Sequence, residues 1–490
     1  MTAHRDPATT TGIEAKSIDW VPLEERTGNP RSLFPLWFMS NANLTTLATG
    51  MLGAALGANF ISSVWSILLG AAVGTIFTAF HSAQGPQLGL PQMIQSRAQF
   101  GYRGVVVICL VVVVSIVGFN IFNQILAADV INLATGLDLS KLWYALISGA
   151  AILLAIFGYH WIHRTQAVLT WLFLATFGVF SLGAAFLLPL GPEEFSLGSV
   201  NWPACLVQFG GAAAYALGWA PYVSDYSRYL PPQTSPVKAT CFTYGGVFVG
   251  ESWLMVLGAF VAALFVEADP TRAIKDAADQ MLPGSGTALL LLALPALVSV
   301  ITVNIYASAL ELVTMADSFV KIRLTRTTRV VACLIIGLAG LVGAELSSGE
   351  FLDSFSSFLA VLLYVLAPWT SVNLVDYYFV RHGRYAISQI FKPGGAYGNW
   401  GWRGLGAYAI GLAAMVPFVV TVWYTGPIAR ALGGADIALL VGLAASSVAY
   451  LILARSLDLE AETKRAESDT ESTGARSVSF GQAQEAASGQ

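Results

Sequence analysis

The sequence predicts an all-α integral membrane protein with about twelve transmembrane helices, and three observations support this fold class. Apolar residues make up 56% of the 490 residues and charged residues only 11%, whereas a soluble chain carries about 25% charged residues. The mean hydropathy is +0.66. The apolar residues gather in long stretches, and two of these stretches contain helix-breaking residues. These features exclude a soluble multidomain enzyme and a largely disordered chain.

A transmembrane helix needs about 20 mostly apolar residues, and stretches of this kind recur along the whole chain. The first half contains them near residues 33–58, 60–80, 104–131, 142–159 and 165–190. The second half contains them near residues 206–227, 240–266, 289–315, 328–346, 354–380, 404–425 and 433–454. An even number of spans places both ends of the chain on the same side of the membrane.

The basic residues are distributed unevenly between the two sides that these spans define. Of the 25 lysines and arginines, 21 fall in the tails and in the loops on the side of the termini. The opposite loops hold only Lys141, Arg272, Lys275 and Arg430. The positive-inside rule therefore predicts a multi-pass protein of the cytoplasmic membrane with both termini in the cytoplasm.

Other residue types narrow the function classes. The net charge of −4 provides no basic face for nucleic acid. The four cysteines lie in apolar stretches without short paired spacings, which indicates packing residues. The five histidines lie in tails or at predicted cytoplasmic helix ends, and no nucleophile with a base is evident. An enzyme, a metal centre and an organic cofactor are therefore not expected.

The first and sixth spans are interrupted by residues that disturb helices. The first contains Pro35 and an SNAN segment at residues 40–43, and the sixth contains Gly218 and Pro221 around Trp219. Proline removes a helix hydrogen bond and glycine permits unusual backbone angles. Two broken helices five spans apart indicate a transporter built from two inverted five-helix repeats. Each break alone is also compatible with an ordinary proline-kinked helix.

This interpretation divides the chain into five parts. They are an N-terminal cytoplasmic tail at 1–32, helices 1–5 as the first repeat at 33–190, helices 6–10 as the second repeat at 206–380, helices 11–12 at 404–454, and a disordered cytoplasmic tail at 455–490.

The third span carries a compact group of amide side chains. Phe119 and Asn123 are four residues apart and share one helix face, and Asn120 and Gln124 form a second pair turned by about 100°. An unpaired amide in hydrocarbon costs free energy, so these groups face protein, water or a ligand. A flat, uncharged ligand could stack on the ring and bond to the amide. Hydrogen bonds between helices would explain the amides equally well.

Three polar side chains in the seventh and eighth spans need separate explanations. The eighth span supplies Asn304, a further amide within an apolar helix. Glu251 lies near the middle of the seventh span and Glu311 in the inner half of the eighth. A charged carboxylate is costly in a membrane, so each is a functional candidate that could carry a proton. A hydrogen bond between packed helices is the alternative.

Three segments resemble the purine–cytosine permease branch of the nucleobase–cation symporter-1 family. They are GIEAKSIDWVPLEERTG before the first span, GPQLGLPQMIQSRAQFGYRG after the second, and GWAPYVSDYSRYLP in the sixth. The resemblance covers nearly the whole span region. It implies the LeuT-type fold, with an inverted repeat of helices 1–5 and 6–10 and two accessory helices. It also implies import of nucleobases or related ring compounds with a coupled cation.

The resemblance also implies a substrate site. The third-helix pattern of an aromatic residue followed four later by an amide matches Phe119 and Asn123, the sixth-helix aromatic matches Trp219, and the eighth-helix amide matches Asn304. Phenylalanine replaces the usual tryptophan at the first of these positions. With the helix breaks included, the candidate substrate-binding residues are Phe119, Asn123, Trp219, Asn304, Asn43 and Gly218, and the secondary candidates are Asn41, Asn120, Gln124 and Thr45.

The coupling ion is expected to be a proton, with Glu311 and Glu251 as candidate carriers. Sodium-coupled relatives use hydroxyl groups of the eighth helix, where this chain offers only Ser299 and Thr302. Sodium is therefore the alternative, and no metal site is expected.

The sequence as a whole predicts a secondary active importer of a purine, cytosine or related planar heterocycle that works by alternating access. One alternative keeps the fold and transports allantoin, a hydantoin, a vitamin or another small solute, with sodium as a coupling ion. The other is a membrane sensor that does not transport. The oligomeric state is not predicted.

Overall fold

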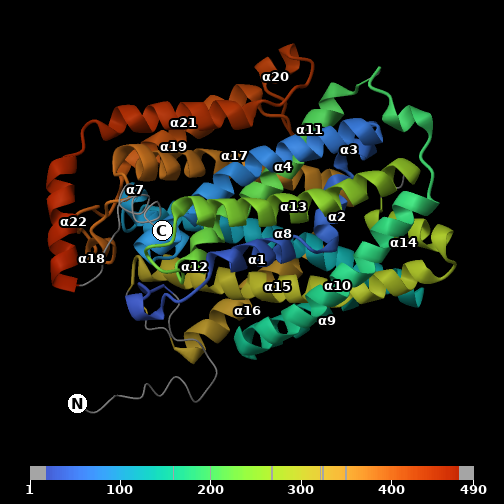
Figure 1. Ribbon diagram of the computed structural model, residues 1–490, viewed down its shortest axis with the longest axis horizontal. Coiled ribbons are helices and arrows are strands. Elements are labelled where there is room, and N and C mark those ends of the chain that lie inside the picture. Colours follow the sequence, from blue (N-terminus) through green and yellow to red (C-terminus); the bar gives the residue numbers. More distant parts are fainter. Residues whose placement is uncertain are drawn as a thin grey trace.

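The computed structural model describes residues 18–157, 159–198, 200–265, 269–320, 322, 325–347 and 350–473. Its helices run side by side in one elongated bundle (Figure 1). Within the described residues no strand forms, and the only bridge recorded there joins Val420 and Thr425. The structure thus confirms the all-α class. The outer parts of the two predicted tails, residues 1–17 and 474–490, lie outside the described residues.

The helices of the first half match the first five predicted spans. After two short 3₁₀ turns, Leu23–Glu25 and Pro30–Ser32, they are α1 (Leu33–Ser40), α2 (Leu44–Gly50), α3 (Leu52–Ala55), α4 (Phe60–Ser82), α5 (Gln84–Leu88), α6 (Gln92–Gln95), α7 (Arg97–Phe100), α8 (Val105–Thr135), α9 (Ser140–Phe157) and α10 (Tyr159–Leu187). The first predicted span is thus divided among α1, α2 and α3.

The helices of the second half begin after a 3₁₀ turn at Pro192–Phe195. They are α11 (Trp202–Leu217), a 3₁₀ turn at Ala220–Tyr222, α12 (Val223–Ser227), α13 (Pro236–Leu264), α14 (Pro270–Met281), α15 (Ser285–Asp317), α16 (Arg326–Leu346), α17 (Phe351–Val375) continued by a π-helical turn (Asp376–Val380), α18 (Ile387–Ile390), α19 (Trp402–Met415), a 3₁₀ turn at Val416–Phe418, α20 (Pro427–Ala431), α21 (Ala438–Ala454) and α22 (Leu459–Thr473).

Six helical segments of the described part are long and apolar enough to cross a membrane. They are Phe60–Leu88, Val105–Thr135, Pro236–Leu264, Ser285–Asp317, Thr327–Leu346 and Phe351–Val380. A seventh arises if α21 and α22, which meet at a bend of 86°, count as one span. The other predicted spans correspond to shorter helices or to helices interrupted by a break.

The two ends of the bundle carry different groups of short helices. In Figure 1, α7, α12, α18 and α22 lie toward the left end, whereas α3 and α14 lie toward the right end.

The C-terminal segment differs from the predicted disordered tail. Leu459–Thr473 forms helix α22, which is held against the C-terminal end of α17 by an ion pair of 2.8 Å from Arg381 to Glu462. Asp469 accepts a hydrogen bond of 2.8 Å from the backbone N–H of Ser388. The polar composition was misleading because these partners come from distant parts of the chain.

The eleventh helix also ends earlier than predicted. α19 stops at Met415, and the chain turns instead of continuing to residue 425. Pro417 lacks the N–H that a continued helix would need. The turn is held by Asp436, which accepts from the backbone N–H of Val420 at 3.0 Å.

Glycines let α4 approach α11 closely. A Cβ atom at Gly70 would overlap the carbonyl oxygen of Phe209, and one at Gly74 would overlap the carbonyl oxygen of Ala213. Backbone atoms cannot swing aside as the end of a flexible side chain can. The two helices must therefore separate if either glycine gains a side chain.

Replacing Gly74 with alanine is expected to lower the melting temperature and the folded yield of the purified protein. Overpacking of this kind costs about 1–3 kcal/mol. Gly149→Ala is the matched control, because a Cβ atom there has no heavy atom within 4 Å. Scanning fluorimetry in detergent measures both variants, and equal melting temperatures would contradict this account of the packing.

Candidate functional site

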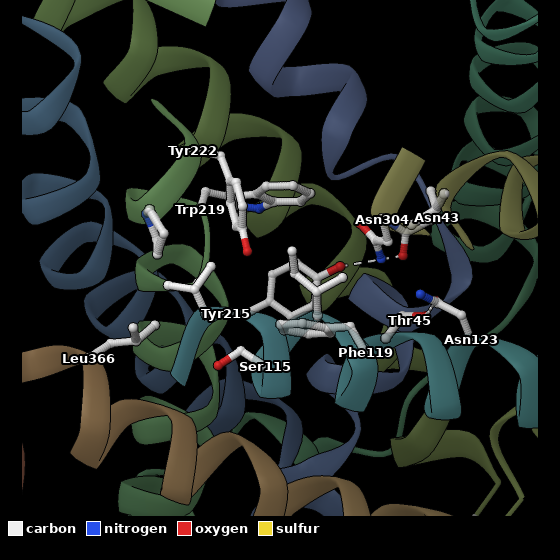
Figure 2. A pocket seen from close by; sticks show the side chains of 15 residues that line it. Asn43, Thr45, Ser115, Phe119, Asn123, Tyr215, Trp219, Tyr222, Asn304 and Leu366 are labelled. Carbon is white, nitrogen blue, oxygen red and sulfur yellow. Dashed lines mark hydrogen bonds between the residues drawn. The ribbon is translucent and has the colours of Figure 1, made fainter. Parts of the chain in front are cut away.

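The interruptions of the first and sixth spans meet at a cavity between α2, α8, α11 and α15 (Figure 2). Its lining carries amides, hydroxyls, aromatic rings and aliphatic groups, and no charged side chain. The lining residues are Asn43, Thr45, Val112, Ser115, Ile116, Phe119, Asn123, Tyr215, Gly218, Trp219, Pro221, Tyr222, Val300, Asn304 and Leu366.

The break in the first span is created by Asn43. Helix α1 ends at Ser40 and α2 begins at Leu44, and Asn43 between them has an extended backbone (φ −152°, ψ 165°). Its Oδ1 accepts from the backbone N–H of Thr46 at 3.1 Å, as an N-cap residue does. Its Nδ2 donates to the carbonyl oxygen of Ser40 at 3.2 Å. Asn43 therefore lines the cavity while its amide holds the two half-helices in place.

The break in the sixth span places an aromatic ring beside the first break. α11 ends at Leu217, and a 3₁₀ turn containing Pro221 separates it from α12. Trp219 lies within this break, and its Nε1–H donates to Oδ1 of Asn41 at 3.1 Å. This bond fixes the orientation of the indole and joins the two interrupted spans.

Aromatic rings form much of the cavity wall. Phe119 on α8 meets Tyr215 edge to face at 5.6 Å and Phe358 edge to face at 5.1 Å between ring centroids. The Thr46 hydroxyl donates to the Tyr215 hydroxyl at 2.7 Å. In the view of Figure 2, the Trp219 indole and the Phe119 ring lie on opposite sides, with Tyr215 between them.

The structure brings seven of the ten predicted substrate-site residues to this one cavity. All six primary candidates and Thr45 line it. The other three lie behind the wall and hold residues in place. Asn41 accepts from Trp219, Asn120 accepts from Asn304 at 3.0 Å, and Gln124 accepts from Ser148 of α9 at 2.7 Å.

Two tyrosines of the wall were missed in the sequence. Tyr215 lies four residues before Trp219 in the same predicted span, so the signal was available. Tyr222 follows the predicted break directly. Its hydroxyl is buried and has no hydrogen-bond partner in the part of the chain that the structure describes.

The two candidate proton carriers are both buried within helices. Glu251 lies on α13, and neither of its carboxyl oxygens has a partner among the described residues. Glu311 lies on α15, and its Oε2 atom has no hydrogen-bond partner among the described residues. The charges of Asp225 and Arg97 act on this carboxyl group. Glu311 also has a side-chain hydrogen bond with Cys109. Ionising a buried carboxyl group is costly, so both residues stay candidate proton carriers.

The sodium candidates of α15 show a different arrangement. The Thr302 hydroxyl donates to the carbonyl oxygen of Val298 in its own helix at 2.8 Å. Ser299 lies half-buried one turn away. Among the described residues, no group of three or more His, Cys, Asp or Glu side chains could hold a metal ion.

An uncharged cavity at two helix breaks inside a bundle of long apolar helices is the arrangement in which membrane transporters bind small solutes. Comparison with known proteins identifies the kind of transporter. Residues 20–442 match the family described as permeases for cytosine/purines, uracil, thiamine and allantoin. The chain belongs to this family.

Individual relatives agree with this assignment. The chain is 37% identical over 442 residues to the putative purine-cytosine permease YxlA of Bacillus subtilis, covering 90% of this chain and 96% of that one. It is 28% identical over 479 residues to the purine-cytosine permease FCY2 of Saccharomyces cerevisiae, covering 91% and 86%.

A solved structure confirms the fold. Mhp1, a nucleobase-cation-symport-1 family transporter solved in a closed conformation with bromovinylhydantoin bound, superposes with a TM-score of 0.70 at 20% identity. The match covers 92% of this chain and 98% of that one. The predicted LeuT-type fold and the predicted purine–cytosine permease branch are both confirmed.

Proposed function

We propose that this chain imports a purine, cytosine or closely related planar heterocycle together with a proton. The observation that carries the proposal is the composition of the cavity wall, which combines aromatic rings with the amides of Asn43, Asn123 and Asn304 and has no charged group. A neutral, flat ligand with hydrogen-bonding edges matches such a wall. An amino acid would leave a carboxylate and an ammonium group without charged partners.

Alternating access is the proposed mechanism. The cavity lies where α1 gives way to α2 and α11 gives way to α12, so movement of these half-helices against α8 and α15 would open one side and close the other. The charge distribution supports cytoplasmic termini. Protonation of a buried carboxyl group would couple this movement to the proton gradient, with Glu311 as the first candidate.

Uptake assays test the proposal directly. Cells that lack their own nucleobase transport would express the chain and receive radiolabelled adenine, guanine, hypoxanthine, cytosine, uracil or allantoin. We expect saturable uptake of at least one purine or cytosine. If cells with normal expression of the protein in the membrane take up none of the six compounds, the proposed substrate class is wrong.

The same cells distinguish the coupling ion. A protonophore is expected to abolish accumulation, whereas replacing sodium by choline should leave it unchanged. The opposite pattern would assign coupling to sodium, for which Ser299 and Thr302 are the candidate ligands on α15.

A further inference from the structure

Helix α15 carries a buried hydroxyl group between the substrate cavity and Glu311. Asn304 lines the cavity, Ser308 follows four residues later, and Glu311 follows after three more. Residues three and four apart share one face of a helix, with Cβ atoms about 5–6 Å apart. Ser308, which is fully buried, therefore separates the cavity wall from Glu311 on this face.

The hydroxyl of Ser308 differs from its neighbours on α15. The hydroxyls of Thr302 and Thr314 donate to carbonyl oxygens four residues back in their own helix, at 2.8 and 2.9 Å. This is the usual partner of a hydroxyl group within a helix. Oγ of Ser308 has no hydrogen-bond partner among the described residues. A buried polar group without a partner is costly, so the position of this hydroxyl requires an explanation.

Tyr222 brings a second hydroxyl group from another element. It belongs to the 3₁₀ turn in the break of the sixth span, and it lines the cavity (Figure 2). Its buried hydroxyl has no partner in the described part of the chain, and the charge of Glu311 acts on it. The three other hydroxyl groups of the cavity wall all have partners; they belong to Thr45, Ser115 and Tyr215.

Glu311 lies just beyond the wall of the cavity. Its carboxyl group has a hydrogen bond with Cys109 of α8, which lies one helical turn from the lining residue Val112. The charges of Asp225 on α12 and Arg97 on α7 also act on it. Its Oε2 atom has no partner among the described residues. Two buried hydroxyls and one carboxyl oxygen near the cavity are thus all without a fixed partner.

We propose that the hydroxyls of Tyr222 and Ser308 relay the coupled proton from the substrate cavity to Glu311. This inference rests on the proposed function, in which Glu311 is the first candidate carrier. A hydronium ion in the cavity gives a proton to the tyrosine oxygen, whose own O–H proton passes to the serine oxygen. The O–H proton of the serine then passes to the carboxylate. The hydronium ion becomes water, the carboxylate becomes a carboxyl group, and both hydroxyls are regenerated.

Removing either hydroxyl group tests the relay. Ser308→Ala and Tyr222→Phe each delete one O–H group and keep the remaining shape of the side chain. Proteoliposomes with an imposed pH gradient measure accumulation of labelled base, and exchange with internal unlabelled base moves no net proton. We expect the ratio of the accumulation rate to the exchange rate to fall at least tenfold in each variant. Ser308→Thr keeps a hydroxyl group and is expected to restore the ratio.

Thr314→Val is the matched control on the same helix. Thr314 is buried, lies three residues after Glu311, and bonds a carbonyl oxygen of its own helix. Its loss should therefore leave the ratio at the wild-type value. Scanning fluorimetry of the purified variants in detergent separates a folding defect from a lost proton path.

The outcomes distinguish the relay from the proposed function. If the wild-type chain takes up no base, the proposed function fails and the relay fails with it. If the wild type accumulates a base with a proton gradient but either folded variant, Ser308→Ala or Tyr222→Phe, keeps the wild-type ratio, the relay alone is wrong. The relay is also wrong if Thr314→Val lowers the ratio as much, if folded Ser308→Thr does not restore it, or if a sodium gradient drives accumulation in place of the proton gradient.

Discussion

Replacing Asn123 or Asn304 with alanine is expected to raise the apparent KM for the transported base about 5- to 150-fold. Each substitution leaves a ligand group unpaired in the cavity, which costs about 1–3 kcal/mol, and every 1.4 kcal/mol corresponds to a factor of ten. Asn304→Ala also removes the partner of Asn120, so its folded yield must be measured alongside its uptake.

Asn132→Ala is the matched control for this prediction. Asn132 lies on the same helix α8, but its side chain bonds Ser140 and Trp143 at the other side of the α8–α9 turn and does not line the cavity. It should keep the wild-type KM. Wild-type kinetics in both Asn123→Ala and Asn304→Ala, at normal expression, would place substrate binding elsewhere.

The helix breaks could be predicted because their causes are local. Proline and glycine act through the backbone of their own segment, so Pro221 and Gly218 indicate an interruption wherever the helix packs. The two breaks are separated by five spans, which indicates two inverted five-helix repeats, and such repeats bring their broken helices together at one site. For the same reason, the aromatic and amide residues nearest the breaks were found.

The roles of individual amides could not be predicted, because they depend on neighbours far away in the sequence. Asn123 and Asn120 look alike on α8, yet only Asn123 reaches the cavity, whereas Asn120 bonds Asn304 across 184 residues. Asn43 was expected to bind substrate, and the structure shows that its amide caps α2. An asparagine three residues before Thr46 is an N-cap signal that the sequence did contain.

The C-terminal helix shows a different limit. Its segment is polar and has no apolar face to bury, so composition favours disorder. The helix α22 is instead held by Glu462, whose partner Arg381 also pairs with Asp376. The sequence could not show this contact, because Arg381 follows the C-terminal end of α17 and lies 81 residues before Glu462.

Glu311→Gln is expected to abolish accumulation of substrate against its gradient while leaving exchange of substrate across the membrane intact. Glu311 lies seven residues after Asn304 on α15, two turns further along the same helix face. It therefore lies between the cavity and the end of the helix near Asp225 and Arg97, whose charges act on it. Glutamine keeps the shape and the hydrogen-bonding capacity of the side chain but cannot carry a proton.

Proteoliposomes with an imposed pH gradient measure both activities of Glu311→Gln. Accumulation of labelled base should fall to the level of the wild type with a protonophore, whereas exchange with internal unlabelled base should persist at a similar rate. Glu251→Gln is the comparison variant, because Glu251 is buried on α13 and has no charged neighbour acting on it among the described residues. Only the residue that carries the proton is needed to couple the gradient to transport. If Glu311→Gln retains accumulation and Glu251→Gln loses it, Glu251 is therefore the proton carrier.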